Sequence, residues 1–249
     1  NADSFWIQGR VYLENADPEK ALTAFNKSML LNPSHPFLFV DKANCHLSLK
    51  QYDLAYESIQ SAIKYALDND GVIYHNIAHA LHRLNRFDEA FVGYDIALEF
   101  DASNPDMLWN RSLLLILTGN YEEGWALFEK RIQTKSLMDN YYTFEGKDWR
   151  GEFEITGKKL LIYSEQGLGD VIQFSRYVKL LKQFGAEVLF EVPAALHAVM
   201  STLDADMTLL KRGTELPDFD FCCPLMSLPY VFKTSLATIP AETPYLFSE

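Results

Sequence analysis

A short polar segment in the second half of the chain carries the clearest chemical signal, because it joins carboxylates and an amide to a glycine-containing turn. Gly167 and Gly169 free the backbone for a tight turn and for close approach of a ligand. A helix that begins near Asp170 presents unpaired N–H groups and a partial positive charge to that ligand. We therefore expect this segment to contact a substrate; its residues are Glu165, Gln166, Gly167, Leu168, Gly169 and Asp170.

Asp170 has two interpretations, which the sequence leaves open. Aspartate is a preferred cap at the N-terminus of a helix and favours the positive end of its dipole. The same carboxylate can also act as a general base toward an acceptor hydroxyl. A dinucleotide-dependent dehydrogenase is disfavoured, because Ile172 stands where the GxGxxG pattern needs its third glycine.

Three histidines in the first half, His75, His79 and His82, have i, i+4, i+7 spacing and share one face of a helix. Two interpretations remain open, a metal site and a polar stripe in a binding groove. The stripe is favoured and no metal is predicted, because no HExxH arrangement is present. As a hypothesis, these imidazoles change charge near neutral pH and modulate ligand binding.

The segment 165–170 follows an apolar run, 158–164, that is typical of a buried strand. Further strands are predicted at 187–192, near 207–210 and at 219–222, with one helix from near Asp170 to Leu181 and another over 194–203. Strand–helix–strand order predicts a parallel, Rossmann-like sheet. Ligands gather beyond the carboxyl ends of such strands, where segment 165–170 lies.

The first half repeats itself. Small residues occupy two columns with spacings of 34, 35 and 34, and bulky residues follow the same spacing. The pattern predicts stacked pairs of antiparallel helices, in which small residues allow close approach and bulky ones fill the space between units. The small columns are Gly9, Ala43, Ala78 and Ser112, then Ala21, Ala55, Ala90 and Gly124, and the second bulky column is Phe25, Ile59, Tyr94 and Phe128.

These columns resemble the tetratricopeptide repeat, in four copies at about 2–35, 36–70, 71–104 and 105–138. The resemblance implies a concave groove, lined by the first helix of each repeat, that holds a polypeptide partner. Aromatic and fixed polar side chains suit an extended peptide. The implied groove residues are Trp6, Arg10, Phe37, Asn44, His75, His79, His82, Arg83 and Trp109.

The run EQGLGDVIQFSRYVKLL, together with GWALFEKRI at 124–132, is similar to bacterial tetratricopeptide-repeat proteins fused to a glycosyltransferase-like domain. GLGDVI also resembles a loop of heptosyltransferases, which have the two-Rossmann GT-B fold. The resemblance implies that Asp170 is catalytic, that the sheet domain binds a sugar acceptor, and that a nucleotide sugar occupies a second domain. No such domain follows here, so we expect the chain to be cut after the first half of that fold and inactive alone, without a cofactor.

Composition narrows the possible partners. The formal charge is −12 with 22 basic and 34 acidic residues, which disfavours nucleic acid. The longest purely apolar run, 113–117, is far shorter than the ~20 residues of a spanning helix, so no membrane span is predicted. Three cysteines, two of them adjacent (Cys222 and Cys223), favour buried free thiols and a reducing cytoplasm.

The predicted fold class is α plus α/β, with repeats over 2–138, a connection over 139–157 and a Rossmann-like glycosyltransferase half over 158–249. The leading hypothesis is a protein whose repeats bind a polypeptide and whose sheet domain forms the acceptor side of a sugar-transfer site. The alternative hypothesis is a non-catalytic interaction scaffold in which the sheet domain serves as a cap.

Overall fold

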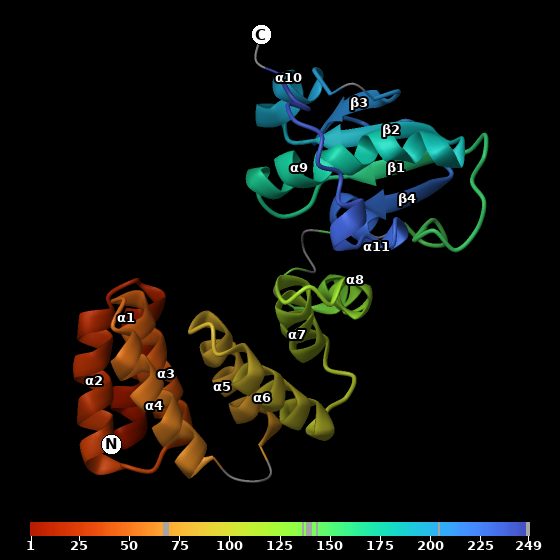
Figure 1. The fold of residues 1–249 in the computed structure, drawn as a ribbon. Coiled ribbons are helices and arrows are strands. Elements are labelled where there is room, and N and C mark those ends of the chain that lie inside the picture. Colours follow the sequence, from red (N-terminus) through yellow and green to blue (C-terminus); the bar gives the residue numbers. More distant parts are fainter. Residues whose placement is uncertain (67–69, 136, 138–140, 143, 204, 248–249) are drawn as a thin grey trace. The chain divides into compact units, whose positions relative to one another are not determined.

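A computed structural model describes residues 1–66, 70–135, 137, 141–142, 144–203 and 205–247 (Figure 1). The chain forms two compact units, Asn1–Leu114 and Leu115–Glu249. The sequence predicts a change of domain near residue 140, and residues 138–140 lie outside the described part. The contacts of the described residues group everything from Leu115 onward with the sheet.

The first unit consists of helix pairs that follow the predicted repeats (Figure 1). Prolines and capping residues set several helix starts. Asp17 precedes Pro18 and accepts a hydrogen bond from the N–H of Lys20 at 3.1 Å. The helices are α1 (Ala2–Glu14), α2 (Pro18–Leu31), α3 (Pro36–Ser48), α4 (Tyr52–Tyr65), α5 (Gly71–Arg83), α6 (Phe87–Phe100) and α7 (Pro105–Leu117), of which α7 continues past Leu114.

The same backbone turn ends the first helix of every pair. Ala16, Lys50, Asn85 and Gly119 have left-handed φ angles of 57°, 58°, 59° and 90°, and they recur with the spacing of the repeats. After α1, the N–H of Ala16 donates to the carbonyl of Leu13 and the next N–H donates to Tyr12. This pair of bonds is the Schellman motif, which satisfies the last carbonyls of a helix. The repeat is therefore also a repeat of backbone conformation.

The predicted columns form the core of the helical unit. Ala43, Ala55, Ala78 and Ala90 are all fully buried. A Cβ atom on Gly9 would lie 2.3 Å from the ring of Phe25, so the two helices meet there without room for a side chain. The bulky column is also buried, which confirms its predicted role, and its members Phe25, Ile59, Tyr94 and Phe128 are 4% exposed or less.

The second unit holds a four-stranded sheet in which all pairings are parallel, in the order β3-β2-β1-β4 (Figure 1). The predicted α plus α/β fold is thus confirmed. Tyr163 at the end of β1 lies opposite Glu191 on one side and Pro224 on the other. The elements are α8 (Tyr121–Phe128), η1 (Glu129–Gln133), β1 (Lys159–Tyr163), α9 (Leu168–Phe174), η3 (Ser175–Phe184), β2 (Glu187–Val192), η4 (Ala194–Leu196), α10 (His197–Met200), β3 (Thr208–Lys211), β4 (Phe221–Pro224), η5 (Leu225–Ser227), α11 (Leu228–Val231) and η6 (Leu236–Thr238).

The segment after β1 differs from the prediction of one helix from near Asp170 to Leu181. Helix α9 already begins at Leu168, and from Ser175 the chain winds more tightly as the 3-10 segment η3. The hydroxyl of Ser175 donates to the carbonyl of Ile172 at 2.9 Å, a local bond that competes with regular α-helical bonding. The apolar face runs on into η3, where Tyr177, Val178 and Leu181 are buried.

Candidate functional site

The first helices of three repeats enclose a pocket of about 340 Å³ in the first unit. Four residues of the predicted groove, Trp6, Arg10, Phe37 and Asn44, come together in it. They belong to α1 and α3, and α5 closes the pocket from the third repeat. The remaining lining residues are Val40, Asp41, Val72 and Asn76.

Trp6 is held in place at one wall of this pocket. Its indole N–H donates to the Oδ2 atom of Asp41 at 2.7 Å, and its ring lies 4.7 Å from that of His35. The guanidinium of Arg10 stacks over the ring at 5.4 Å from its centroid. Burial raises the pKa of Asp41. The hydrogen bond from Trp6 and the charge of Arg10 favour the ionised carboxylate and lower this pKa, but burial has the larger effect. The aromatic wall is therefore fixed before a ligand arrives.

Asp41, Asn76 and Asn110 form a polar column that was not predicted from the sequence. They occupy equivalent positions of successive repeats, with spacings of 35 and 34. Asp41 and Asn76 line the pocket, and the amide of Asn110 donates to Nε2 of His75 at 3.1 Å. Because the column follows the same spacing as the small residues, that spacing was the signal for it. Side-chain carbonyl, carboxylate and amide groups offer both donors and acceptors to a peptide backbone.

The predicted residues Arg83 and Trp109 lie outside the pocket lining. Nη1 of Arg83 donates to Oδ1 of Asn44 at 3.0 Å, so its guanidinium lies beside the pocket. The indole nitrogen of Trp109 is buried without an acceptor among the residues that the structure describes. Arg83 therefore contacts the pocket through Asn44, whereas Trp109 lies in the fourth repeat and contributes nothing to the pocket lining.

The three histidines also lie outside the pocket lining, along α5. Burial lowers the pKa of His75 and His82, and burial together with Arg83 lowers that of His79 to about 4. Since an amide nitrogen only donates, Nε2 of His75 accepts from Asn110 and its ring is neutral. The hypothesis of a charge change near neutral pH disagrees with these directions, because rings with lowered pKa values are neutral at pH 7.

In the second unit, the turn after β1 exposes Gly167, Leu168 and Gly169. Gln166 enters this turn with a φ of 56°, a left-handed conformation that few side chains adopt. The Oδ2 atom of Asp170 accepts a hydrogen bond from the N–H of Gly167 at 3.0 Å. Asp170 is thus the third residue of α9 rather than its N-cap, and it supplies the carboxylate half of a capping box.

Glu165 differs from the other residues of this segment, because its side chain is fully buried in an ion pair with Arg131. The two N–H···O distances are 2.7 and 3.1 Å, and the N–H of Met226 also donates to Glu165 at 2.9 Å. The sequence predicted Glu165 as a substrate ligand, but its carboxylate is inside the protein and fully bonded. Nothing in its local sequence identifies a partner 34 residues away.

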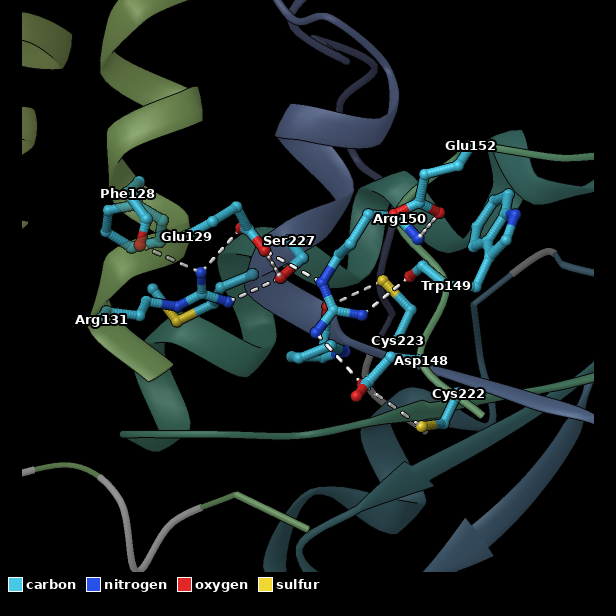
Figure 2. A network of polar contacts seen from close by, with 12 residues as sticks. Phe128, Glu129, Arg131, Asp148, Trp149, Arg150, Glu152, Cys222, Cys223 and Ser227 are labelled. Atoms are coloured by element: carbon cyan, nitrogen blue, oxygen red, sulfur yellow. Dashed lines mark hydrogen bonds and ion pairs between the residues drawn. The ribbon is translucent and has the colours of Figure 1, made fainter. Parts of the chain in front are cut away.

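Glu129 and Ser227 extend this pair into a network that includes a second arginine (Figure 2). The carboxylate of Glu129 accepts from Nη1 of Arg131 at 2.8 Å and from Nε of Arg150 at 3.0 Å. Ser227 donates to Glu129 and accepts from Arg131. Although burial alone lowers the pKa of Arg131, the carboxylates of Glu165 and Glu129 raise it well above its usual value.

The network lies where Rossmann-like sheets commonly bind ligands. Strand order reverses between β1 and β4, and crevices beyond the carboxyl ends of two such strands are the usual ligand position. Glu165 follows β1, Ser227 follows β4, and Arg131 bonds to both. The side chain of Arg131 is fully buried, so this crevice is occupied by the chain itself.

Among the described residues, three or more His, Cys, Asp or Glu side chains nowhere gather into a possible metal site. Within the same part of the chain, no helix combines the length and the hydrophobicity that crossing a bilayer requires.

Comparison with known proteins identifies the repeats. Residues 2–35 match the family model described as tetratricopeptide repeat. A segment of 105 residues, 41% of this chain, is 31% identical to Protein FlbA of Caulobacter vibrioides and covers 17% of it. A segment of 103 residues is 29% identical to small glutamine-rich tetratricopeptide repeat-containing protein 2 of Mycosarcoma maydis, covering 41% of this chain and 29% of that protein. The chain thus spans less than a third of either relative.

Similar solved structures include PilF of Pseudomonas aeruginosa, with 20% identity and a TM-score of 0.49, covering 54% of this chain and 61% of that one. YrrB, described as a TPR protein with an unusual peptide-binding site, has 15% identity and a TM-score of 0.43, with 55% and 70% covered. The first TPR of Spaghetti, bound to an HSP90 peptide, has 20% identity and a TM-score of 0.42, with 47% and 94% covered. Tetratricopeptide repeats are present, and none of these similarities bears on the predicted resemblance of the second unit to glycosyltransferases.

Proposed function

We propose that the chain is a protein-interaction module whose first unit binds an extended polypeptide segment in the groove formed by α1, α3 and α5. The observation that carries the proposal is the pocket of about 340 Å³, in which residues from three successive repeats converge. Tetratricopeptide repeats act as interaction domains, and the structure of Spaghetti is described as bound to a peptide. This function corresponds to the scaffold hypothesis drawn from the sequence.

The chemistry of the pocket supports a peptide ligand. Phe37, Val40 and the fixed ring of Trp6 provide an apolar surface for one large side chain. Asn44 and Asn76 have amide groups that both donate and accept, as a peptide backbone requires. A preformed wall lowers the conformational cost of binding.

A charge placed in the pocket tests this function directly. Val72 lines the pocket, is 52% exposed and lies in the first turn of α5, where an aspartate is compatible with the helix dipole. Val92 on α6 is 59% exposed and does not line the pocket, so it gives a matched control. For a peptide selected from a random library on the wild-type chain, we expect Val72→Asp to weaken binding about tenfold or more and Val92→Asp to leave it unchanged.

The readout is the dissociation constant from calorimetry, with circular dichroism to show that both variants fold. Equal loss of affinity in the two variants, or none in either, would contradict a peptide site in this groove. Failure of any library peptide to bind the wild-type chain would contradict the function itself.

Sugar transfer is a second candidate function, which the resemblance to glycosyltransferases implies for Asp170. One feature favours it: Gly167 and Gly169 are exposed beside Asp170, at the carboxyl end of β1. The Oδ2 atom of Asp170 caps Gly167, which leaves Oδ1 as the oxygen that would face an acceptor hydroxyl. The buried network of Arg131 and Glu165 fills the neighbouring crevice and counts against a large donor pocket there.

We expect residues 1–249 alone to transfer no sugar from a nucleotide-sugar mixture to hydroxyl acceptors. In a longer form of the protein that shows turnover, Asp170→Asn should abolish it while keeping an oxygen for the cap of Gly167. Retained turnover in that variant would restrict Asp170 to its capping role.

A further inference from the structure

We infer that the groove selects acidic segments, in which carboxylate side chains flank one bulky apolar residue. This inference rests on the proposed peptide-binding function and names the chemistry of its ligand. It comes from the position of two arginines beside the pocket in a unit that is otherwise acidic.

The first unit carries 9 basic and 15 acidic residues, so its body repels an acidic chain. Three other basic side chains of this unit pair with carboxylates. These pairs are Lys20 with Asp17, Arg86 with Glu89, and Arg111 with Asp95.

Arg10 and Arg83 differ from those side chains. Both are exposed, and neither forms an ion pair with a residue in the described part of the unit. Arg10 lines the pocket, and Arg83 donates to Asn44, which also lines it. Two guanidinium groups that form no ion pair among the described residues therefore lie at one pocket, and each has a geometry that suits a carboxylate.

Acidic residues of the groove offset this pair only in part. Asp41 lines the pocket and interacts electrostatically with Arg10, but its Oδ2 atom accepts from the indole N–H of Trp6 and burial raises its pKa. Asp106 acts electrostatically on His75, which is not part of the pocket lining. The lowered pKa values of the neighbouring histidines keep those rings neutral at pH 7, so Arg10 and Arg83 supply the positive charge.

Between the arginines, the pocket accepts an apolar side chain. Phe37, Val40 and Val72 come from α3 and α5 and face the same volume of about 340 Å³. The polar column continues to Asn110 in the fourth repeat, where the amide nitrogen donates to His75 and to the carbonyl of Asp106, so its side-chain oxygen is the group that could accept from a bound chain. An internal acidic segment fits this arrangement, since the polar column continues past the pocket.

The test uses peptides of about 12 residues, which span up to ~40 Å when extended. The first peptide is Gly and Ser with a central Phe flanked by Asp on both sides, acetylated and amidated. Matched peptides replace Asp by Asn, Asp by Lys, or Phe by Ala, and one Asn peptide keeps a free C-terminal carboxylate. Affinity for residues 1–249 is measured by fluorescence anisotropy at low and high salt.

We expect the Asp peptide to bind about five- to tenfold more tightly than the Asn peptide at low salt, and the difference to shrink at high salt. Replacing Phe by Ala should weaken binding about tenfold or more. Arg10→Gln and Arg83→Gln should each weaken the Asp peptide about threefold more than they weaken the Asn peptide. Arg86→Gln removes the same charge away from the pocket and should alter neither peptide.

Equal affinity for the Asp, Asn and Lys peptides would overturn the acidic preference and leave the peptide-binding function standing. The preference for an internal acidic segment is also overturned if the free C-terminal carboxylate alone restores affinity, because the arginines would then bind a chain end. Failure of all these peptides, while a library peptide binds in a Val72-dependent manner, overturns the inference alone. Failure of every peptide overturns the proposed function with it.

Discussion

The guanidinium of Arg131 and the carboxylate of Glu165 form a two-pronged ion pair that is closed to solvent, with N–H···O distances of 2.7 and 3.1 Å. Arg131 comes from η1, directly after the last helix of the repeats, and Glu165 follows the central strand β1. The pair therefore fixes the end of the repeat segment to the sheet inside one compact unit.

Breaking this pair should destabilise the second unit. Glu165→Gln leaves the buried guanidinium of Arg131 without this carboxylate and should lower the free energy of unfolding by about 3 kcal/mol. Replacing both residues by apolar ones should lower it less. Glu187→Gln, at the exposed start of β2, is the matched control. Urea unfolding followed by amide hydrogen exchange in β1 measures the loss, and a Glu165→Gln variant within about 0.5 kcal/mol of the wild type would contradict the role of the pair.

Substitutions in the repeated turn should stabilise the protein rather than destabilise it. Ala16 and Lys50 hold left-handed φ angles that cost about 1 kcal/mol for a residue with a Cβ atom. Ala16→Gly and Lys50→Gly should each raise the free energy of unfolding of the first unit by about 0.5–1 kcal/mol. Gly119→Ala should have the reverse effect on its turn. Thermal melts report these shifts, and a lower melting temperature for both glycine variants would show that the turns carry no strain.

Acid should destabilise the first unit through its histidines. An unfolded histidine binds a proton below about pH 6.5, whereas His79 in the folded unit has its pKa lowered to about 4 by burial and by Arg83. Between these values the unfolded chain holds more protons, so stability falls as the pH drops from about 6.5 toward 4. His79→Gln should flatten this slope in urea melts at pH 7, 5.5 and 4.5.

Asp41 has a raised pKa, so its protonation makes the folded unit more stable as the pH falls. Because Asp41 is present in both proteins, the difference in slope between wild type and His79→Gln reports on His79. His197→Gln, in the second unit, controls for removal of a histidine elsewhere. An unchanged slope in His79→Gln would show that this ring titrates as freely in the folded unit as in the unfolded chain.

The three thiols should be inert in the folded chain. Cys45, Cys222 and Cys223 are free and buried. Burial and Asp41 raise the pKa of Cys45 to about 12, and burial and Asp148 raise that of Cys222 to about 12. Since the thiolate is the reactive form, Ellman's reagent at pH 7.4 should modify all three only after unfolding in urea. Rapid reaction of one thiol in the absence of urea would contradict this packing.

The repeats were predictable because their signal is local and periodic. The burial of Ala43, Ala78 and Tyr94 follows from a spacing that recurs from one repeat to the next. The polar column of Asp41, Asn76 and Asn110 has the same spacing, but its side chains are unalike, so a comparison of similar residues does not find it. The members of the pocket were therefore predicted only in part.

The site beyond β1 was harder to predict, because its chemistry depends on partners distant in sequence. A glutamate beside two glycines is typical of an exposed ligand loop, and only Arg131 and the N–H of Met226 make Glu165 a buried group. The start of α9 was placed near Asp170, since aspartate favours both the N-cap and the N3 position. The hydrogen bond to Gly167 distinguishes these two positions.

The division of the chain at Leu114 also limits how the molecule can be recombined. The fourth repeat contributes α7, which begins in the first unit, and α8, which belongs to the second. A chimaera that exchanged whole repeats at residue 138 would separate Arg131 from Glu165 and leave each without its counter-charge. Breakpoints in the turns at Ala16, Lys50 or Asn85 leave Arg131 and Glu165 in the same parent sequence, so exchanges at these turns avoid that loss.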